Sequence, residues 1–375
     1  MANVSSSNGL EKRPKLRFPG FDEPWKVFKA EELFQNITDK NHPDETVLTI
    51  IQGKGTLPRE QAGRNIHYDD ASLSNYKKVE QGDFIIHLRS FEGGLEMANE
   101  AGIVSPAYTI LRCKRPHSSL FYDAYFHTDK FINHNLSKSV EGIRDGRQIS
   151  YEAFKWLGIP YCEPTEQEKI SNLFAALNER IAKQRDLVES LKKYKRGLNK
   201  RVFEKITSGA KQQIPLSELC ESISSGRTTS SNADGIFPLF GSTGVVGKTN
   251  TIEFDGDIVL IARVGANAGK VNYFSGQCAV TDNTLVIRVK ENLVQAKFLA
   301  FFLEYYNLHR LIFGSGQPLV TGGQLKKIKM PLVSLTTQVS LTQRLEVLDS
   351  INEVHEKYAQ SLTLLKSGLM QQLFI

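Results

Sequence analysis

The chain has 375 residues, a formal net charge of +6 and a pI near 8.9, and 40% of its residues are apolar. This length predicts two or three domains of ordinary soluble composition, and the modest positive charge alone says little about partners. The four cysteines are far apart, which indicates neither a disulfide framework nor a zinc site. The polar N-terminus and the lack of a long apolar run predict neither a signal peptide nor a membrane span. We therefore expect a cytoplasmic protein with no membrane contact.

The first part of the chain predicts a mixed α+β domain over residues 1–164, with residues 1–13 disordered. Runs rich in β-branched and aromatic residues at Thr46–Gln52, Phe84–Arg89 and Tyr108–Cys113 alternate with Gly, Asn and Asp, which is typical of strands and turns. This region is therefore expected to be the first globular domain.

A long helix is expected over residues 165–206. Thr165 and Glu168 have the spacing of a capping box directly after Pro164. Apolar residues then recur at steps of three and four, which predicts a coiled-coil seam. The apolar seam residues are Ile170, Phe174, Leu177, Ile181, Val188, Leu191 and Leu198. Gln184 and Lys195 occupy polar points of the same stripe.

A second globular domain is expected over residues 207–335, followed by a second long helix over 336–375. Asp257–Val264 and Asn283–Val289 predict strands, whereas Leu293–Leu311 has helical spacing. The seam of the last helix is predicted at Leu341, Leu345, Leu348, Leu362 and Leu369, with His355 at one of its polar points. His355 is therefore most simply a packed residue.

The two helical segments are copies of one another. Thr165 aligns with Thr336, and 336 − 165 = 171; the same offset takes Gln167 to Gln338 without a gap. The globular parts correspond more weakly, because Gly82-Asp83 and Gly256-Asp257 each precede a strand. We therefore expect an internal pseudo-twofold repeat, in which the two helices pair in antiparallel orientation and the domains have diverged.

Sequence motifs for catalysis are weak. Gly241–Thr249 resembles a phosphate-binding loop, but the spacing of its glycines departs from that motif by one residue. The histidines form no metal-ligand pair, and neither a nucleophile elbow nor a methyltransferase motif is present. The sequence therefore predicts no catalytic residue, metal or cofactor, although an NTP-using enzyme built on Gly241–Thr249 stays open as an alternative.

Several loops combine arginine or lysine with amide side chains, a mixture that suits phosphates and base edges of DNA. For some of these positions, a surface turn or a solvated helix face explains the residues equally well. The candidate DNA-binding residues are Arg64, Arg89, Arg144, Arg147, Arg227, Lys248, Arg263, Asn267, Lys270 and Gln317.

Three segments and the duplicated helix carry a family resemblance. The segments are Pro14–Trp25, Ile159–Gln167 and Gly316–Pro331. With these features the chain resembles the specificity subunit of type I restriction-modification enzymes, and the resemblance covers nearly its whole length.

The resemblance implies an α+β chain in which two similar mixed α/β target recognition domains are separated by two long helices that form an antiparallel coiled coil. It further implies a non-catalytic subunit that reads a bipartite, gapped site in double-stranded DNA. The implied partners are two modification subunits, which methylate adenine N6, and restriction subunits, which translocate and cut. A coiled-coil scaffold with protein-binding modules is the second alternative.

Overall fold

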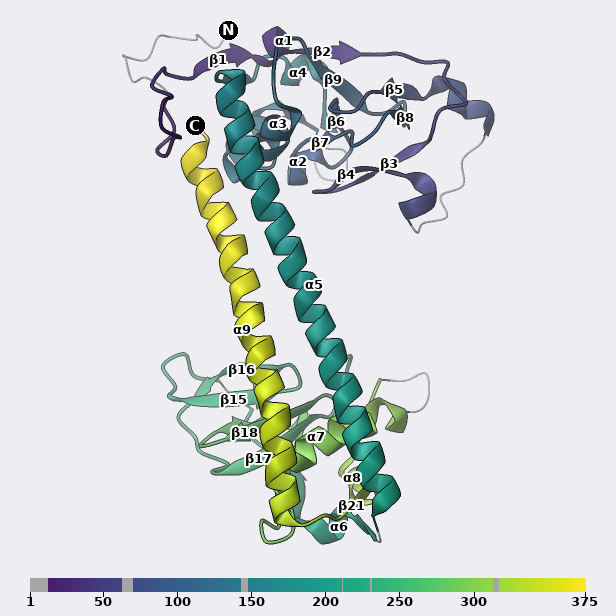
Figure 1. The fold of residues 1–375 in the computed structure, drawn as a ribbon, viewed down its shortest axis with the longest axis vertical. Helices are drawn as coiled ribbons and strands as arrows, with labels where there is room; N and C mark the ends of the chain where they lie inside the picture. The colour runs from purple at the N-terminus through teal and green to yellow at the C-terminus, as the bar shows by residue number, and fades with distance from the viewer. Residues whose placement is uncertain (1–12, 63–69, 143–147, 211, 230, 313–316) are drawn as a thin grey trace. The chain divides into compact units, whose positions relative to one another are not determined.

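A computed structural model describes residues 13–62, 70–142, 148–210, 212–229, 231–312 and 317–375. The chain forms two compact units. Unit 1 comprises residues 1–183 with 359–375, and unit 2 comprises residues 184–358. Both unit boundaries fall inside long helices, so each unit contains a segment of both helices (Figure 1). The predicted division into residues 1–164, 165–206, 207–335 and 336–375 stays a prediction, and the segment expected to be disordered lies, except for Arg13, outside the described residues.

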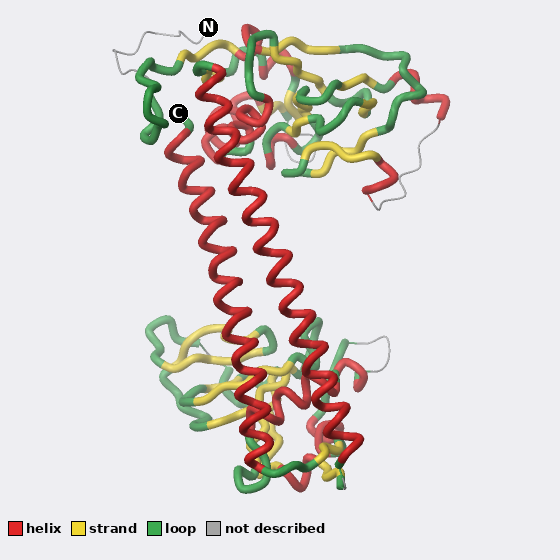
Figure 2. The backbone as a smooth tube through the Cα atoms, in the orientation of Figure 1, coloured by secondary structure: helices red, strands yellow, loops and turns green. Residues whose placement is uncertain are grey.

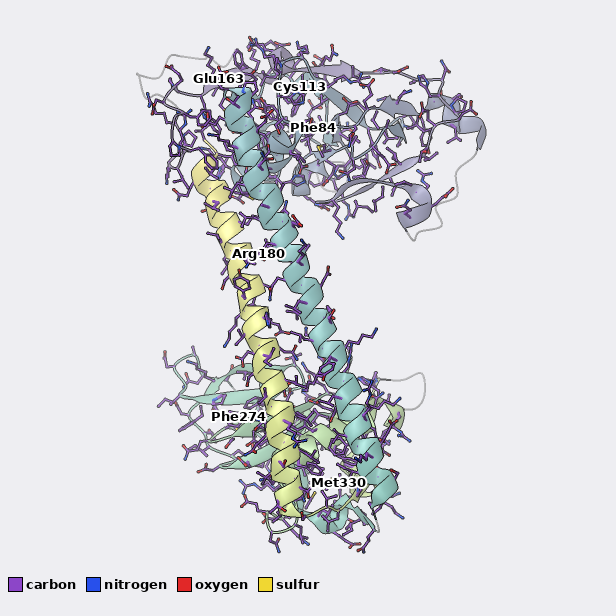
Figure 3. The ribbon with its side chains drawn as sticks, in the orientation of Figure 1. Phe84, Cys113, Glu163, Arg180, Phe274 and Met330 are labelled. Atoms are coloured by element: carbon purple, nitrogen blue, oxygen red, sulfur yellow. The ribbon has the colours of Figure 1, made fainter. Side chains whose placement is uncertain are left out.

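Unit 1 is built on a four-stranded antiparallel sheet in the order β2-β9-β6-β7. Its strands are β2 (Phe34–Ile37), β9 (Thr109–Cys113), β6 (Phe84–Ile86) and β7 (Glu96–Met97). Helix α3 (Ser119–Phe126) packs on this sheet through aromatic rings. The ring of Phe84, labelled in Figure 3, lies 5.0 Å from that of Phe126 and 5.9 Å from that of Phe34. An aromatic cluster therefore forms the core of this unit.

Short ribbons and helices surround that core. Two-stranded antiparallel ribbons pair β1 (Lys26–Lys29) with β12 (Gly158–Tyr161), β3 (Leu48–Ile51) with β4 (Gly55–Pro58), β5 (Lys77–Val79) with β8 (Gly102–Val104), and β10 (Val140–Glu141) with β11 (Gln148–Ile149). The short helices are α1 (Ala30–Leu33), η1 (Arg59–Ala62), η2 (Asp70–Asn75), α2 (Ser90–Gly93), η3 (Lys130–Asn135), η4 (Leu136–Ser139) and α4 (Tyr151–Phe154).

Unit 2 has a four-stranded antiparallel sheet in the order β14-β20-β17-β18, a three-stranded sheet β16-β15-β19 and the ribbon β13-β21. Its strands are β13 (Gln213–Pro215), β14 (Cys220–Ser225), β15 (Phe237–Gly241), β16 (Gly244–Thr249), β17 (Asp257–Ala262), β18 (Val271–Ser275), β19 (Ala279–Val280), β20 (Thr284–Val289) and β21 (Lys329–Pro331). Its short helices are α6 (Leu216–Leu219), α7 (Ala296–Tyr306), η6 (Leu308–Leu311) and α8 (Gly322–Lys326). Phe274 and Met330, labelled in Figure 3, belong to its two apolar clusters.

The two four-stranded sheets have the same topology. When the four strands of each sheet are numbered 1 to 4 along the chain, both sheets have the spatial order 1-4-2-3. The turns before β6 and β17 are also alike, since Gly82 and Gly256 adopt φ angles of 90° and 89°. Such positive values are readily available only to glycine, which explains why both copies kept it. The predicted α+β fold with an internal repeat is confirmed.

The two long helices are α5 (Pro164–Gly209) and α9 (Leu335–Leu373), and both are unbroken (Figure 2). The predicted capping box at Thr165 is wrong, because α5 begins one residue earlier. The carbonyl of Glu163 accepts the first helical N–H bonds, and Pro164 occupies the first turn, where its missing N–H costs nothing. Ser334 caps α9 at the equivalent position, 171 residues after Glu163, with its Oγ accepting from the N–H of Thr337.

Within each unit the segments of α5 and α9 pack against each other in antiparallel orientation. In unit 1 the rings of Phe174 and Phe374 stack at 5.9 Å. In unit 2 Gln184 lies beside His355, and Lys195, further along α5, lies beside Asp349, which is earlier in α9. As the residue number rises along α5, the number of the contacted residue on α9 falls, as an antiparallel pair requires.

One contact joins two residues that the repeat makes equivalent. Gln184 Nε2 donates to His355 Nδ1 at 2.8 Å and to the His355 carbonyl at 3.1 Å, and 355 − 184 is the repeat offset of 171. A residue touches its own equivalent only at the twofold axis of an isologous pair. The two helix copies are therefore related by a local pseudo-twofold axis at this point, and the predicted polar points form one hydrogen-bonded pair.

A buried glutamine joins each long helix to its globular region in the same way. Gln167 Oε1 accepts from the backbone N–H of Ser118, the N-cap residue of α3, at 3.0 Å, and its Nε2 donates to the carbonyl five residues before it. Gln338 Oε1 accepts from the N–H of Gln295, the N-cap residue of α7, at 2.9 Å and repeats the second bond. Both glutamines are fully buried, so the repeat extends from the helices into the domains.

None of the helices in the described part of the chain combines the length and the apolar character needed to cross a bilayer. The same residues contain no group of three His, Cys, Asp or Glu side chains arranged to hold a metal ion.

Candidate nucleic-acid interface

A groove of about 1030 Å³ in unit 2 brings two predicted DNA-binding residues next to the basic part of α5. Asn267 and Lys270 line it from the loop after β17. The cations that α5 contributes are Lys192, Lys195, Arg196 and Lys200. The far wall is formed by the end of α7, by η6 and by α9. Residues distant in sequence therefore form one concave surface that carries charged side chains.

Charges in this groove are divided between paired and unpaired groups. Lys195 lies 2.5 Å from Asp349 and 3.5 Å from Glu304, so one ammonium serves two carboxylates. Burial raises the pKa of Glu304, which Lys195 only partly offsets. Arg196 and Lys270 form no ion pair within the described part of the chain, so two cations at this groove are left to meet an anionic ligand.

The strand ends beside the groove carry two more predicted residues. The N–H of Arg263 donates to the Asn283 carbonyl at 2.9 Å, and its carbonyl accepts from Val320 at 2.9 Å. The N–H of Gly265 donates to the carbonyl of the residue after Gln317 at 3.1 Å. These bonds join the loop that carries Arg263 to the segment that carries Gln317, whose side chain is exposed. Arg263, Asn267, Lys270 and Gln317 therefore lie on neighbouring segments of unit 2.

Lys248 and Arg227 lie elsewhere in unit 2, and both side chains are exposed. Lys248 is on β16, where it pairs with Pro238 of β15 in an antiparallel hairpin. A phosphate-binding loop instead leads from a strand into a helix. The segment Gly241–Thr249 is therefore a hairpin, and an NTP site built on it is not supported. Arg227 lies two residues after the end of β14.

Arg89 is the one predicted residue of unit 1 that the structure describes. It is exposed and stands at the N-cap of α2, so the strand expected over Phe84–Arg89 is wrong beyond Ile86. Arg64, Arg144 and Arg147 lie outside the described residues.

Unit 1 contains a groove of about 1070 Å³ that the sequence did not predict. It lies between the end of α9 and the segment after α3, the same place that the unit 2 groove takes between α5 and the segment after α7. Phe374 lines it, and its repeat equivalent Phe203 packs on α7 in unit 2. The basic residues of the groove are Arg13, Lys15, His127, Lys130, His134 and Lys138, against one aspartate, Asp129. Arg13 and Lys15 come from the N-terminal side of the chain and the other four from residues 127–138, so the fold brings two distant segments together.

That the predicted seam residues form the interface between the two long helices stays a prediction; the structure shows that all of them are at least half-buried, several within the cores of the units. The buried ones are Ile170, Phe174, Ile181, Val188, Leu345 and Leu362. The half-buried ones are Leu177, Leu191, Leu198, Leu341, Leu348 and Leu369. Tighter burial at some points and polar contacts at others give the pair a defined alignment.

Comparisons with known proteins point to one family. Residues 210–364 match the family model described as the type I restriction modification DNA specificity domain. A specificity subunit of the Escherichia coli type I enzyme EcoprrI is 28% identical over 116 residues, which is 31% of this chain and 29% of that protein. A putative type I specificity subunit of Mycoplasma pneumoniae is 27% identical over 141 residues, which is 36% of this chain and 46% of that protein. Both alignments thus span less than half of the curated relatives.

The resemblance to type I specificity subunits is confirmed. Solved structures extend the likeness in fold to almost the whole chain. The S subunit from M. genitalium superposes with a TM-score of 0.63 at 16% identity, over 97% of this chain and 99% of that one. The HsdS subunit from Thermoanaerobacter tengcongensis gives a TM-score of 0.51 at 18% identity, over 96% and 98%. The arrangement of two mixed domains with long helices is therefore that of these specificity subunits.

Proposed function

We propose that this chain is the DNA-recognition subunit of a type I restriction-modification complex and reads a bipartite, gapped site. The observation that carries the proposal is the type I specificity domain over residues 210–364, together with a first unit of the same sheet topology. Two domains that share a fold but differ in surface residues suit two different half-sites. The helices that join them are copies, which suits a shared role in spacing and assembly.

The grooves supply the electrostatic part of this proposal. Both contain cations that form no ion pair with any described residue, such as Arg196 and Lys270 in unit 2 and Lys130 and Lys138 in unit 1. Lysine and arginine that neutralise phosphates release counterions, so the affinity depends steeply on salt. We assign Arg89, Arg227, Lys248, Arg263, Asn267, Lys270 and Gln317 to the DNA side, together with Arg64, Arg144 and Arg147 outside the described residues.

The partners follow from the repeat. Two copies of one helical surface offer two equivalent sites, which suits two modification subunits, with restriction subunits joining the complex. The chain itself supplies no catalytic residue in this proposal. The partner must turn the target adenine out of the helix to methylate it, so this subunit binds and positions the DNA.

Genome-wide mapping of N6-methyladenine tests the proposal. The chain is produced with its own modification subunits in a host without such methylation. We expect one motif with two specific halves and a fixed gap, absent when the chain is omitted. Methylation without a motif, or the same motif without this chain, would refute the proposal.

Residue-level binding assays then test the DNA surface of unit 2. Lys270→Ala should weaken binding to a duplex that carries the mapped motif and lower the salt slope by about one. Lys205→Ala is the matched control, since Lys205 is exposed on α5 and does not line the groove. Equal effects of the two variants would contradict the assignment of Lys270.

The two alternatives are less well supported. The NTP-using enzyme loses its structural basis, because Gly241–Thr249 is a strand hairpin. A coiled-coil scaffold with protein-binding modules accounts for the helices but not for the match to a DNA specificity domain. Binding to DNA that is independent of both salt and sequence would favour the scaffold.

A further inference from the structure

The hairpin β3–β4 of unit 1 ends in a tight turn, Gln52-Gly53-Lys54-Gly55. The turn is closed by the N–H of Lys54, which donates to the Ile51 carbonyl at 2.9 Å. Gly53 and Gly55 adopt φ angles of 73° and 78°, which side chains rarely allow. A Cβ on Gly55 would also lie 2.5 Å from the carbonyl oxygen of Met97. The backbone of this turn is therefore specified closely by its sequence.

A buried carboxylate accepts hydrogen bonds from the backbone of the same turn. Glu96 on β7 is fully buried and accepts from the N–H of Gly53 at 2.6 Å and from the N–H of Gly55 at 2.9 Å. Burying a carboxylate is costly unless hydrogen bonds and an opposite charge compensate it. Both of its oxygens are used on the two glycines that flank Lys54.

His127, the C-cap residue of α3, supplies the compensating charge. Its Nε2 lies 3.4 Å from Glu96 Oε1, and its Nδ1 lies 2.7 Å from the Asp123 carbonyl. An acceptor at each ring nitrogen favours the doubly protonated imidazolium. Burial by itself lowers the pKa of His127, but the bonds to Glu96 and Asp123 outweigh it and raise the pKa to about 8. The turn is thus anchored by an ion pair inside the unit.

Asn99 completes the anchor on the other side of the turn. Its Nδ2 donates to the carbonyl of Lys54 at 2.8 Å and to the carbonyl of Thr56 at 2.9 Å. The backbone groups of Gly53, Lys54 and Gly55 are therefore bonded within the unit, while the side chain of Lys54 is exposed and forms no ion pair among the residues that the structure describes. A fixed backbone that carries an unpaired cation loses little entropy when the cation meets an anion.

We propose that Lys54 is a DNA phosphate contact of unit 1, and that Glu96, whose charge His127 compensates, is the positioning residue that holds the turn carrying Lys54 in place. The inference rests on the proposed DNA-recognition function and adds a contact that lies outside both grooves. Lysine acts on phosphate as a point charge, so Lys54 contributes affinity rather than base selectivity. No sequence motif predicts this contact, because a lysine between two glycines also fits any surface turn.

The test measures binding of the full chain, in complex with its modification subunits, to a duplex that carries the mapped methylation motif. Lys54→Ala should weaken binding about tenfold and lower the salt slope by about one, with the motif unchanged. Lys26→Ala is the matched control, since Lys26 is an exposed lysine on β1 of the same unit. It should leave affinity and slope as they are.

Glu96→Gln separates positioning from charge. In the Glu96→Gln background, Lys54→Ala should lower the affinity for the duplex by less than about threefold, because the turn no longer holds the ammonium in place. If Glu96→Gln does not fold, Lys54→Ala alone decides.

If the Lys54→Ala complex binds the duplex with the same affinity as the wild-type complex, the inference is overturned, and the proposed function is unaffected. Loss of the modification subunits from the complex on Lys54→Ala also overturns it, because it would place Lys54 at a protein interface. Failure of the wild-type complex to bind the duplex at all refutes the proposed function itself.

Discussion

The two buried glutamines allow the repeat to be tested energetically. Replacing Gln167 by Met keeps the side-chain length but leaves one N–H and one carbonyl without partners. Replacing Gln338 by Met leaves one N–H and two carbonyls, since Gln338 Nε2 also donates to Leu293 at 3.0 Å. An orphaned buried group costs about 1 kcal/mol or more. We expect a loss of about 2 kcal/mol for Gln167→Met and about 3 kcal/mol for Gln338→Met.

The assay can follow the units separately. The chain has two tryptophans, Trp25 and Trp156, and both belong to unit 1. Urea unfolding followed by tryptophan fluorescence therefore reports Gln167→Met, and hydrogen exchange of α7 reports Gln338→Met. Gln343→Met, at an exposed position of α9, is the control. If both variants changed the free energy of unfolding by less than about 0.5 kcal/mol, the reasoning would be refuted, since water would then be hydrogen-bonding the groups that the glutamine amides bond.

Three further outcomes are expected. Because the pKa of His127 is raised from 6.5 to about 8, its contribution to unfolding free energy is complete below pH 6.5 and is lost as the pH rises through 8. His127→Gln should remove this loss in urea titrations between pH 6 and 9. Glu166→Gln replaces the buried carboxylate that accepts from the Arg17 guanidinium and the Trp25 indole N–H by a neutral amide with a single acceptor oxygen. It should destabilise unit 1 by about 3 kcal/mol and expose the N-terminal segment to protease. Leucine at both Gln184 and His355 should keep or raise stability but loosen the helix alignment, which cysteine cross-linking across the pair would detect as additional registers.

The sequence predicted the parts of the fold that depend on periodicity. The stripe from Ile170 to Leu198 and its copy in α9 identified both long helices, because a helical face repeats every three or four residues. Helix starts were less accurate: Thr165 fits a capping box, yet Glu163 precedes the first turn because the following proline favours the N1 position. The position of a helix end depends on a single capping residue, so two neighbouring residues that can both cap a helix are hard to tell apart from sequence.

The site was harder to predict than the fold. Asn267 and Lys270 were predicted together because they share a short loop at a strand end; the structure has both at a groove, and their contact with DNA stays a prediction. The basic groove of unit 1 was missed, since Lys15 and Lys130 come from segments more than a hundred residues apart in sequence. Hydrogen bonds such as that between Glu96 and Gly53 also leave no pattern in the sequence. A linear motif records chemistry only when its residues are neighbours along the chain.

The contact between Gln184 and His355 has an evolutionary consequence. In a dimer of identical half-length chains, the residue on the twofold axis would always face a copy of itself. A single chain that contains both copies is free of this constraint, because each position is encoded separately. Here an amide donor faces an imidazole acceptor, a pairing of unlike groups at the axis that two identical chains cannot make. Fusion of the copies thus allowed the centre of the helix pair to become asymmetric while the rest of the repeat was retained.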